Sequence, residues 1–215
     1  MSAPVEGVRV GRRKSTQKAE AILRAAEDLF LAQGFQGTSM DAVARAACVS
    51  KQTVYSHFAN KEALFTACIT AKVASYGFDE TMTFEDVDLR DGLLSLCRRF
   101  VDLLFDPEVI AMHRIVMAEA ASQPRIAQLF VESGPKRTKA TVGGYLRRQV
   151  ARGRLRIDDE RFFYASVQLL NMVVGMYQLE LWMGLRDSIP KDELDRHLER
   201  VVDDFLTLYT ARGQV

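Results

Sequence analysis

The chain has 215 residues, of which 48% are hydrophobic, and its 29 Lys and Arg nearly balance its 28 Asp and Glu. This length leaves room for one or two domains with a buried core. The sequence has no apolar run of about 18 residues or more, which excludes an ordinary membrane-spanning helix. The first residues include Glu6 and lack the apolar stretch of a secretory signal, so we expect a cytoplasmic protein.

Three cysteines, Cys48, Cys68 and Cys97, lie at spacings that form no metal-ligand pattern with the histidines. We therefore predict neither a metal site nor a cofactor. Redox sensing is one reading of these thiols, but we expect them to be small, buried hydrophobic residues.

The first predicted helix runs from about Thr16 to Gln33 and follows a basic arm, residues 1–14, that we expect to be flexible. Gly34 is expected to end this helix, with Phe35 making the hydrophobic contact of its C-terminal cap. One face of the helix carries apolar residues at helical spacing, namely Ile22, Ala26, Leu29 and Phe30.

Two short helices are predicted between Thr38 and Lys61. Thr38 and Asp41 have the spacing of a capping box, which predicts the start of the first helix. The run Cys48-Val49-Ser50 forms the turn, and Ser50 can cap a second helix from Lys51 to Phe58. Small residues on the first helix would let the two helices cross closely.

The second short helix has an apolar side, with Val54 and Phe58, and a polar side. An ordinary amphipathic helix pair inside an all-α core would explain the apolar side alone. The polar side, however, has hydrogen-bonding and aromatic groups suited to base edges and phosphates, where a solvated face usually carries Glu and Lys. These features favour a helix-turn-helix that binds duplex DNA. The polar residues are Gln52, Thr53, Tyr55 and Ser56.

Residues from about Ser15 to Phe65 resemble the DNA-binding domain of TetR-family transcriptional regulators. Cys48 departs from the family pattern, which usually has glycine in this turn, so the residue must accept a left-handed or strained backbone or the turn must bend differently. The resemblance rests on Ile22-Leu23-x-Ala25-Ala26-x-x-Leu29-Phe30-x-x-x-Gly34-Phe35, then Thr38-Ser39-Met40, then Val49-Ser50-x-x-x-Val54-Tyr55-x-His57-Phe58-x-x-Lys61-Glu62-x-Leu64.

The resemblance implies an all-α fold of about nine or ten helices, with the helix-turn-helix domain at residues 15–61 and a ligand-binding and dimerisation domain at 62–215. It also implies two sets of DNA contacts. For three residues the alternative to a DNA contact is a structural role. Thr38 would then only cap a helix, His57 would only pack at the domain edge, and Lys61 would only be solvated. The set for the major groove is Lys51, Gln52, Tyr55 and Ser56. The set for the phosphates is Thr38, Thr53, His57 and Lys61, and Ser39 is included as a further DNA contact.

Positive charge is concentrated around this motif. Residues 1–65 hold nine Lys and Arg against six Asp and Glu, whereas the remainder holds 20 against 22. The run Arg12-Arg13-Lys14 either lies along the DNA or is a solvated tail. The resulting net charge of +3 is modest, so we expect tight binding to need two protomers.

The rest of the chain is predicted to form helices with short connections. A fourth helix is expected from Asn60 to about Tyr76, followed by a loop from Gly77 to Asp88. Several later helices start near a proline, where the missing N–H costs nothing. They are expected at about Leu89–Phe105, Pro107–Ser122, Pro124–Ser133, Pro135–Arg152, Asp158–Leu185 and Pro190–Arg212.

The last two predicted helices are apolar on more than one face, which indicates burial on more than one side. The simplest arrangement is a four-helix bundle to which each of two protomers gives two helices, as in the dimer interface of the family. Two-fold symmetry would then place the recognition helices roughly 34–36 Å apart and predicts a near-palindromic operator. The apolar residues are Phe162, Phe163, Val167, Leu170, Val174, Tyr177, Leu181, Leu194, Leu198, Val201, Val202, Phe205 and Leu208.

From about Leu103 to Arg156 the chain looks like the AefR-type ligand domains of the same family. This implies a cavity for a flat or flexible apolar molecule, which methionine and aromatic side chains suit, although a plain core has the same composition. Polar His113, Glu119 and Gln168 either orient a ligand or satisfy one another. The candidate lining residues are Phe100, Leu104, Met112, His113, Met117, Phe130, Tyr145, Met172, Met176 and Trp182.

These expectations describe a homodimeric repressor that a small ligand releases from its operator by favouring a second arrangement of the dimer. The alternative is a DNA-binding regulator or activator controlled by a protein partner, which predicts a filled middle domain. An enzyme is disfavoured, because the sequence has no Gly-rich phosphate loop, metal-ligand spacing or nucleophile motif.

Overall fold

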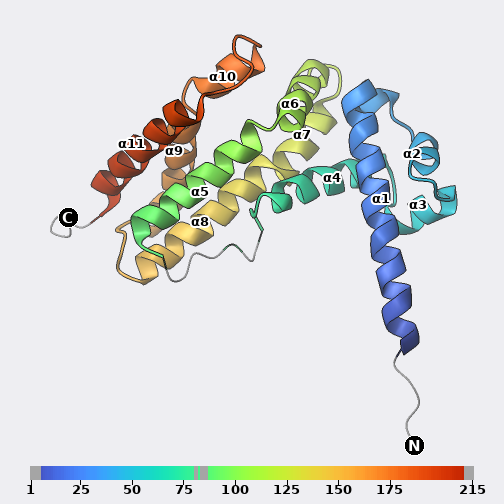
Figure 1. The fold of residues 1–215 in the computed structure, drawn as a ribbon, viewed down its shortest axis with the longest axis horizontal. Helices are drawn as coiled ribbons and strands as arrows, with labels where there is room; N and C mark the ends of the chain where they lie inside the picture. Colours follow the sequence, from blue (N-terminus) through green and yellow to red (C-terminus); the bar gives the residue numbers. More distant parts are fainter. Residues whose placement is uncertain (1–5, 80–81, 83–86, 211–215) are drawn as a thin grey trace, which may run out of the picture. The chain divides into compact units, whose positions relative to one another are not determined.

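The computed structural model describes residues 6–79, 82 and 87–210, with side chains from Ser15 onward. Regular structure in this part of the chain is helical, as predicted, and no strand occurs there. The chain divides into two compact units (Figure 1), of which unit 1 is Met1–Ala71 with Ile115–Ser133, and unit 2 is Lys72–Arg114 with Gly134–Val215. Among the described helices, none has the length and apolar character needed to span a membrane.

Unit 1 is built around three phenylalanines. Phe30 and Phe35 each meet the ring of Phe65 edge to face, with centroids 5.3 and 5.5 Å apart, and all three side chains are buried. The helices of this unit are α1 (Glu6–Gly37), α2 (Met40–Ala46), α3 (Lys51–His57), the first part of α4 (Lys61–Ser75), the end of α6 (Pro107–Glu119) and α7 (Pro124–Ser133).

Helix α1 begins earlier than predicted and turns at the predicted glycine. It starts at Glu6 instead of Thr16, so residues expected in the arm continue the helix. Residues 1–5 of that arm lie outside the described residues. At Gly34 the backbone has φ 71° and ψ 179°, a conformation that glycine tolerates and other residues avoid. The helix predicted to end at Gly34 breaks at that residue but continues to Gly37, and Phe35 packs on Phe30 and Phe65 after the break.

The prediction that Thr38 caps α2 is wrong. Ser39 is the N-cap, and its Oγ accepts a hydrogen bond from the N–H of Ala42 at 3.1 Å. Thr38 is buried, and its hydroxyl donates to the carbonyl oxygen of Gly34 at 2.8 Å. Thr38 and Ser39 have the same capping chemistry, and the turn at Gly34 decides which of them faces the helix.

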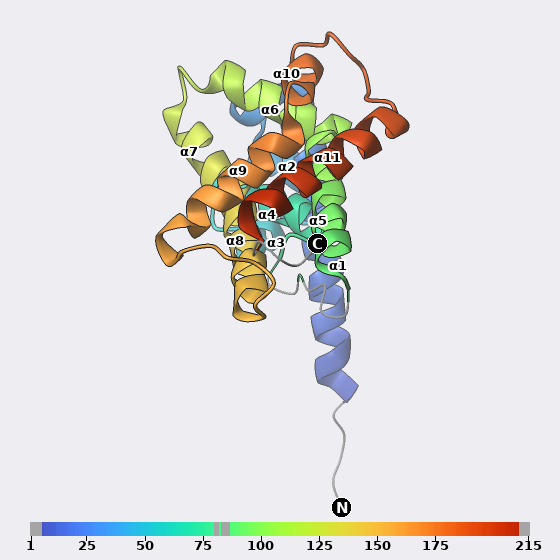
Figure 2. The same ribbon diagram turned by 90° about the vertical axis from the view of Figure 1, so that its left-hand side faces the viewer.

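Unit 2 is a bundle in which α5, α8, α9 and α11 pack on one another. Figure 2 shows α9 and α11 on the side nearest the viewer. Its helices are the last part of α4, α5 (Leu89–Leu104), the first part of α6, α8 (Pro135–Ala151), a 3₁₀ turn (Asp159–Arg161), α9 (Phe162–Val174), α10 (Tyr177–Trp182) and α11 (Lys191–Tyr209). The residues at the centre of its core include Leu93, Cys97, Val142, Leu146, Leu169, Leu198 and Phe205.

The prediction of a single helix from Asp158 to Leu185 is wrong, because this segment forms a 3₁₀ turn, α9 and α10. Gly175 ends α9 with φ 47° and ψ −138°, which again requires glycine. His197 of α11 places Nε2 3.0 Å from the carbonyl oxygen of Val173 and 3.1 Å from that of Met172. A side chain from another helix thus meets carbonyl groups that the break leaves without helical partners.

The other predicted helices are present, with ends shifted by about three residues or fewer. Asp88 caps α5 by accepting a hydrogen bond from the N–H of Arg90 at 2.8 Å. Half of the predicted loop from Gly77 to Asp88 lies outside the described residues, as does the last part of the helix predicted to reach Arg212.

Two of the three cysteines are buried as expected. Burial raises the pKa of Cys68 and Cys97 to about 12, so both thiols stay protonated. Cys48 is exposed, contrary to the prediction, because it lies in the turn between α2 and α3.

Candidate DNA-binding site

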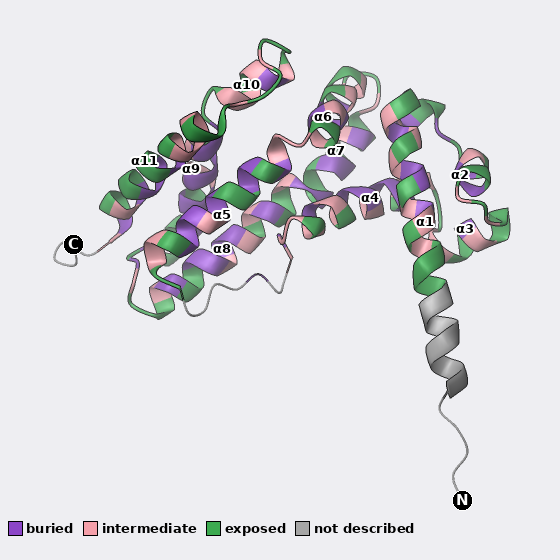
Figure 3. Cartoon of the chain, viewed as in Figure 1, coloured by how far each residue is buried: buried purple, intermediate pink, exposed green. Residues whose placement is uncertain are grey.

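Helix α3 has one packed side and one outward side, as the sequence predicts. Ser50 caps it, with Oγ accepting a hydrogen bond from the N–H of Thr53 at 3.1 Å. Val54 is completely buried beneath the helix. Four predicted groove residues are exposed on α3 (Figure 3), namely Lys51, Gln52, Tyr55 and Ser56.

The turn before α3 is held in a left-handed conformation. Cys48 has φ 52°, as expected for a position where the family usually has glycine. The N–H of Val49 donates to the carbonyl oxygen of Ala44 at 3.0 Å, which closes the turn on the end of α2. The turn therefore keeps its conformation between α2 and α3, although a cysteine stands where the family usually has glycine.

An ion pair between α2 and α3 was not predicted. Lys51 Nζ lies 2.8 Å from Asp41 Oδ1 and donates a hydrogen bond to Asp41 Oδ2 at 2.9 Å, and this bond, together with the charge of Asp41, raises the pKa of Lys51. The two residues are far apart in sequence, and only the crossing of the helices brings them together. Asp41 thereby holds the ammonium group of Lys51 at the first turn of α3.

Some of the polar side chains on α3 bind the helix itself. Ser56 Oγ donates to the carbonyl oxygen of Thr53 at 2.8 Å, and the hydroxyls of Ser50 and Thr53 lie 2.8 Å apart. Tyr55 is 46% exposed. The imidazole of His57 is half-buried beside Phe58, with ring centroids 6.2 Å apart.

The side chain of Lys61 forms hydrogen bonds with backbone carbonyl groups of the protein itself. Its Nζ donates to the carbonyl oxygens of Phe35 and Thr38 at 2.7 and 2.9 Å and lies 4.3 Å from the centroid of the Phe35 ring. Burial lowers the pKa of Lys61, although the charge of Glu119 opposes this. The ammonium group therefore ties the first turn of α4 to the end of α1, whereas the sequence suggested a phosphate contact or a solvated side chain.

The predicted ligand residues are divided between the two units. Met117 and Phe130 belong to unit 1 and the others to unit 2. Met117 and Met176 are 49% and 64% exposed. The remaining side chains are buried or partly buried, and they are Phe100, Leu104, Met112, His113, Phe130, Tyr145, Met172 and Trp182. A cavity of about 320 Å³ lies beside α8 and is lined by Asp79, Met82, Arg137, Ala140, Thr141, Gly144 and Arg148.

Within unit 2, α6 and α10 meet through the rings of His113 and Trp182, whose centroids are 5.0 Å apart. His113 Nδ1 lies 2.8 Å from the carbonyl oxygen of Val109, and burial lowers the pKa of His113. Arg114 donates to the carbonyl oxygens of Leu181 and Trp182 at 2.6 and 2.8 Å. Trp182 Nε1 is buried and has no hydrogen-bond partner among the described residues.

The three polar candidates for ligand orientation have separate surroundings. His113 contacts Val109, whereas Gln168 Oε1 accepts a hydrogen bond from the hydroxyl of Tyr209 at 2.8 Å. Glu119 lies against Gly34, where its Oε1 would be 2.3 Å from an added Cβ.

Two family models match the chain. Residues 22–68 match the tetR family of bacterial regulatory proteins, and residues 91–211 match the C-terminal domain of AefR-like transcriptional repressors. The chain belongs to the TetR family. TetR-family proteins are DNA-binding transcriptional regulators and not enzymes, which agrees with the capped, outward-facing α3.

Solved TetR-family structures resemble the whole described fold. A regulator from Mesorhizobium loti is 29% identical, with a TM-score of 0.76, and the match covers 92% of this chain and 98% of that one. The flavonoid-responsive regulator FrrA is 33% identical, with a TM-score of 0.74, and the match covers 92% of this chain and all of FrrA.

Curated TetR-type relatives match over part of their length. The mycofactocin biosynthesis transcriptional regulator MftR of Mycobacterium tuberculosis is 43% identical over 118 residues, 55% of this chain and 58% of MftR. YhgD of Bacillus subtilis is 43% identical over 56 residues, 26% of this chain and 29% of YhgD.

Proposed function

We propose that this regulator is a homodimeric repressor that binds a near-palindromic operator and is released by a small apolar or aromatic ligand. The observation that carries the proposal is the polar outer face of α3, supported from below by the buried Val54 and capped by Ser50. As a protein that binds chromosomal DNA, it would act in the cytoplasm.

The proposed DNA contacts follow the exposure of the predicted residues. Lys51, Gln52, Tyr55 and Ser56 enter the major groove, where side chains read base edges. Ser39, Thr53 and His57 lie toward the phosphates. Thr38 and Lys61 contribute by holding the end of α1, because their polar groups bind the carbonyl oxygens of that turn.

The proposed dimer surface lies on α9 and α11. Phe163 and Tyr164 on α9 and Leu208 on α11 are 72%, 62% and 58% exposed, and large exposed apolar side chains that gather on one surface mark protein–protein interfaces. A second copy of the chain would cover this surface with the same residues and form an isologous interface.

The proposed ligand belongs to the aromatic class. Support comes from FrrA, which responds to flavonoids and shares 33% identity over nearly the whole chain. It also comes from Trp182, since a buried N–H without an acceptor is costly and could donate to a ligand oxygen. A regulator controlled by a protein partner is the second candidate, favoured by the burial of Phe100 and Tyr145 within a continuous core.

Selection of bound fragments from a pool of random duplex DNA tests the DNA-binding proposal. We expect enrichment of a near-palindrome whose half-sites lie about one helical turn apart. Failure to enrich any site would contradict both the proposed repressor function and the proposed operator. Flavonoids added to the selected duplex in a gel shift then test the ligand class, and release is the expected result.

A further inference from the structure

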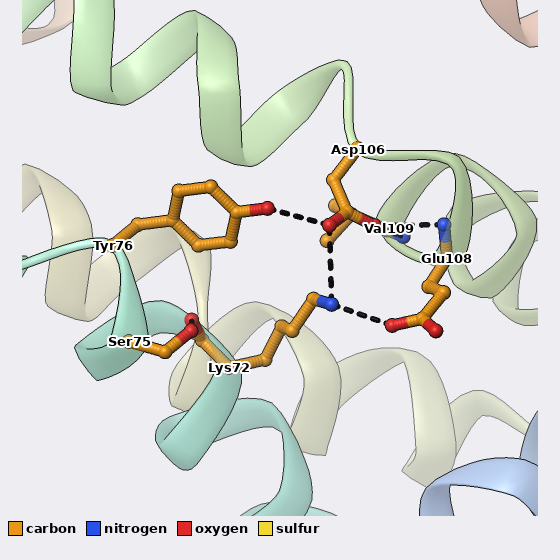
Figure 4. Close-up of polar contacts among 6 residues, drawn as sticks. All are labelled: Lys72, Ser75, Tyr76, Asp106, Glu108 and Val109. Atoms are coloured by element: carbon orange, nitrogen blue, oxygen red, sulfur yellow. Dashed lines mark hydrogen bonds and ion pairs between the residues drawn. The ribbon is translucent and has the colours of Figure 1, made fainter.

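Helix α4 and the corner between α5 and α6 are joined by a group of polar side chains in unit 2 (Figure 4). Lys72 is on the last turn of α4, and Tyr76 follows that helix directly. Asp106 and Glu108 belong to the corner where α6 begins. We call these four residues the α4 latch.

Asp106 binds both elements at once. Its Oδ1 accepts hydrogen bonds from the N–H groups of Glu108 and Val109 at 2.8 and 3.1 Å, so it caps α6. Its Oδ2 accepts a hydrogen bond from the hydroxyl of Tyr76 at 2.5 Å and lies 3.1 Å from Lys72 Nζ. One carboxylate thus orders the start of α6 with one oxygen and holds the end of α4 with the other.

The latch is shielded more on one side than on the other. The side chains of Lys72 and Asp106 are 20% and 15% exposed, whereas Glu108, which lies 2.6 Å from Lys72, is 56% exposed. Burial alone would raise the pKa of Asp106, but hydrogen bonds from Tyr76, the N–H of Val109 and Lys72 outweigh burial and lower it. Burial and the bond to Asp106 raise the pKa of Tyr76 to about 12. These groups therefore stabilise Asp106 as a charged carboxylate.

The two helices joined at the latch also belong to the DNA-binding unit. Helix α4 starts at Lys61, which ties down the end of α1, and continues without a break to Ser75. Helix α6 starts beside Asp106 and ends at Glu119, against Gly34 of α1. Continuous helices transmit a displacement along their length because their hydrogen-bond ladders resist local deformation.

We propose that Asp106 is a positioning residue for DNA recognition, because it sets the placement of α4 relative to the start of α6 through Tyr76 and Lys72. The inference rests on the proposed DNA-binding function. Asp106 does not contact DNA, and its effect reaches the helix-turn-helix along α4. A change in this latch should therefore alter operator affinity without removing a phosphate contact.

Asp106→Asn separates the two tasks of the residue. Asparagine is a good N-cap, so its carbonyl oxygen can still accept from the N–H groups of α6. Its NH₂ group would then face the ammonium group of Lys72, which has no acceptor, and it would force the hydroxyl of Tyr76 to accept a hydrogen bond that it now donates. Tyr76→Phe weakens the latch without touching the cap, Asp106→Ala removes both functions, and Glu108→Gln is the control on the exposed side.

The experiment measures affinity for the selected duplex at several salt concentrations, together with hydrogen exchange of residues 72–76. For Asp106→Asn we expect about a 5-fold or larger change in operator affinity, an unchanged salt slope and faster exchange. Tyr76→Phe should shift affinity in the same direction by a smaller factor, and Glu108→Gln should resemble the wild type.

Wild-type affinity in both Asp106→Asn and Tyr76→Phe would overturn the proposal, as would a loss of thermal stability with no change in the affinity of the folded protein. If Asp106→Asn does not fold, Tyr76→Phe decides by the same criteria. A wild-type protein that selects no duplex contradicts the proposed function, whereas unchanged exchange at residues 72–76 contradicts the latch.

Discussion

Gly34 and Lys61 shape the connection between α1 and the helix-turn-helix. The positive φ of Gly34 turns the chain, and the turn leaves the carbonyl groups of Phe35 and Thr38 without helical partners. Lys61 supplies the missing donors. Val54 and Phe65, buried below, make the recognition helix part of a packed unit. The position of α3 therefore depends on side chains that pack beneath it and at the end of α1.

Replacement of Gly34 by alanine should destabilise the protein by about 2–3 kcal/mol, since a new Cβ would combine backbone strain with a clash. The added atom would lie 2.3 Å from Glu119 Oε1. Gly153→Ala is the matched control, because Gly153 has a similar φ of 72° and no atom within 4 Å of an added Cβ. Urea unfolding of both variants provides the comparison, and equal losses would contradict a role for Glu119.

Lys51 and Lys61 should differ in their effect on the salt dependence of DNA binding. Lys61→Met should cost about 1–3 kcal/mol of stability by leaving carbonyl groups unpaired, while the slope of log K against log salt stays the same. Lys51→Ala should leave stability nearly unchanged and reduce the slope by about 0.9, because one cation fewer at the DNA releases fewer counterions on binding. A reduced slope for Lys61→Met would instead restore Lys61 as a phosphate contact.

At the scale of elements, the contact of α6 with α10 depends on a neutral histidine. Burial lowers the pKa of His113, so the unfolded chain binds a proton more readily than the folded one. The contribution of His113 to the free energy of unfolding is fully present above its unfolded-state pKa of about 6.5. It is lost as the pH falls toward the lower pKa of the folded state. The free energy of unfolding rises with pH in this range because the unfolded state binds more protons than the folded state.

We therefore expect the melting temperature to fall between about pH 7 and pH 5 by more in the wild type than in His113→Gln, which has no imidazole to protonate. Calorimetry at each pH measures the difference between the two proteins, so that titration of other groups cancels. Parallel curves for the two proteins would show that His113 is not charged on unfolding.

For the whole molecule, the exposed apolar surface on α9 and α11 predicts a dimer. Phe163→Glu should yield a monomer in sedimentation velocity and weaken operator binding by about 100-fold or more, because a charge buried in the proposed apolar interface is left without a partner. Val131→Glu is the control, since Val131 is 45% exposed on α7 in unit 1. A Phe163→Glu protein that stays dimeric would place the interface elsewhere.

The sequence alone determined the helical class, most helix boundaries and the outward face of α3. Apolar spacing, prolines near helix starts and caps such as Ser50 act within a few residues of one another, and these local preferences agreed with the final packing. The unusual backbone at Cys48 was predicted from the resemblance to the TetR family, which usually has glycine in this turn. Each of these features depends on neighbours along the chain.

Tertiary structure decided the features that depend on contacts between distant residues. Ser39 replaced Thr38 as the cap because the turn at Gly34 buries Thr38, and Gly175 broke a long apolar segment where His197 of α11 meets the open carbonyl groups. Lys61 turned inward, and Asp106 came to bind Tyr76 and Lys72. Periodicity reports which face of a helix is apolar, but a buried polar group is placed by partners that only the folded chain brings within hydrogen-bond distance.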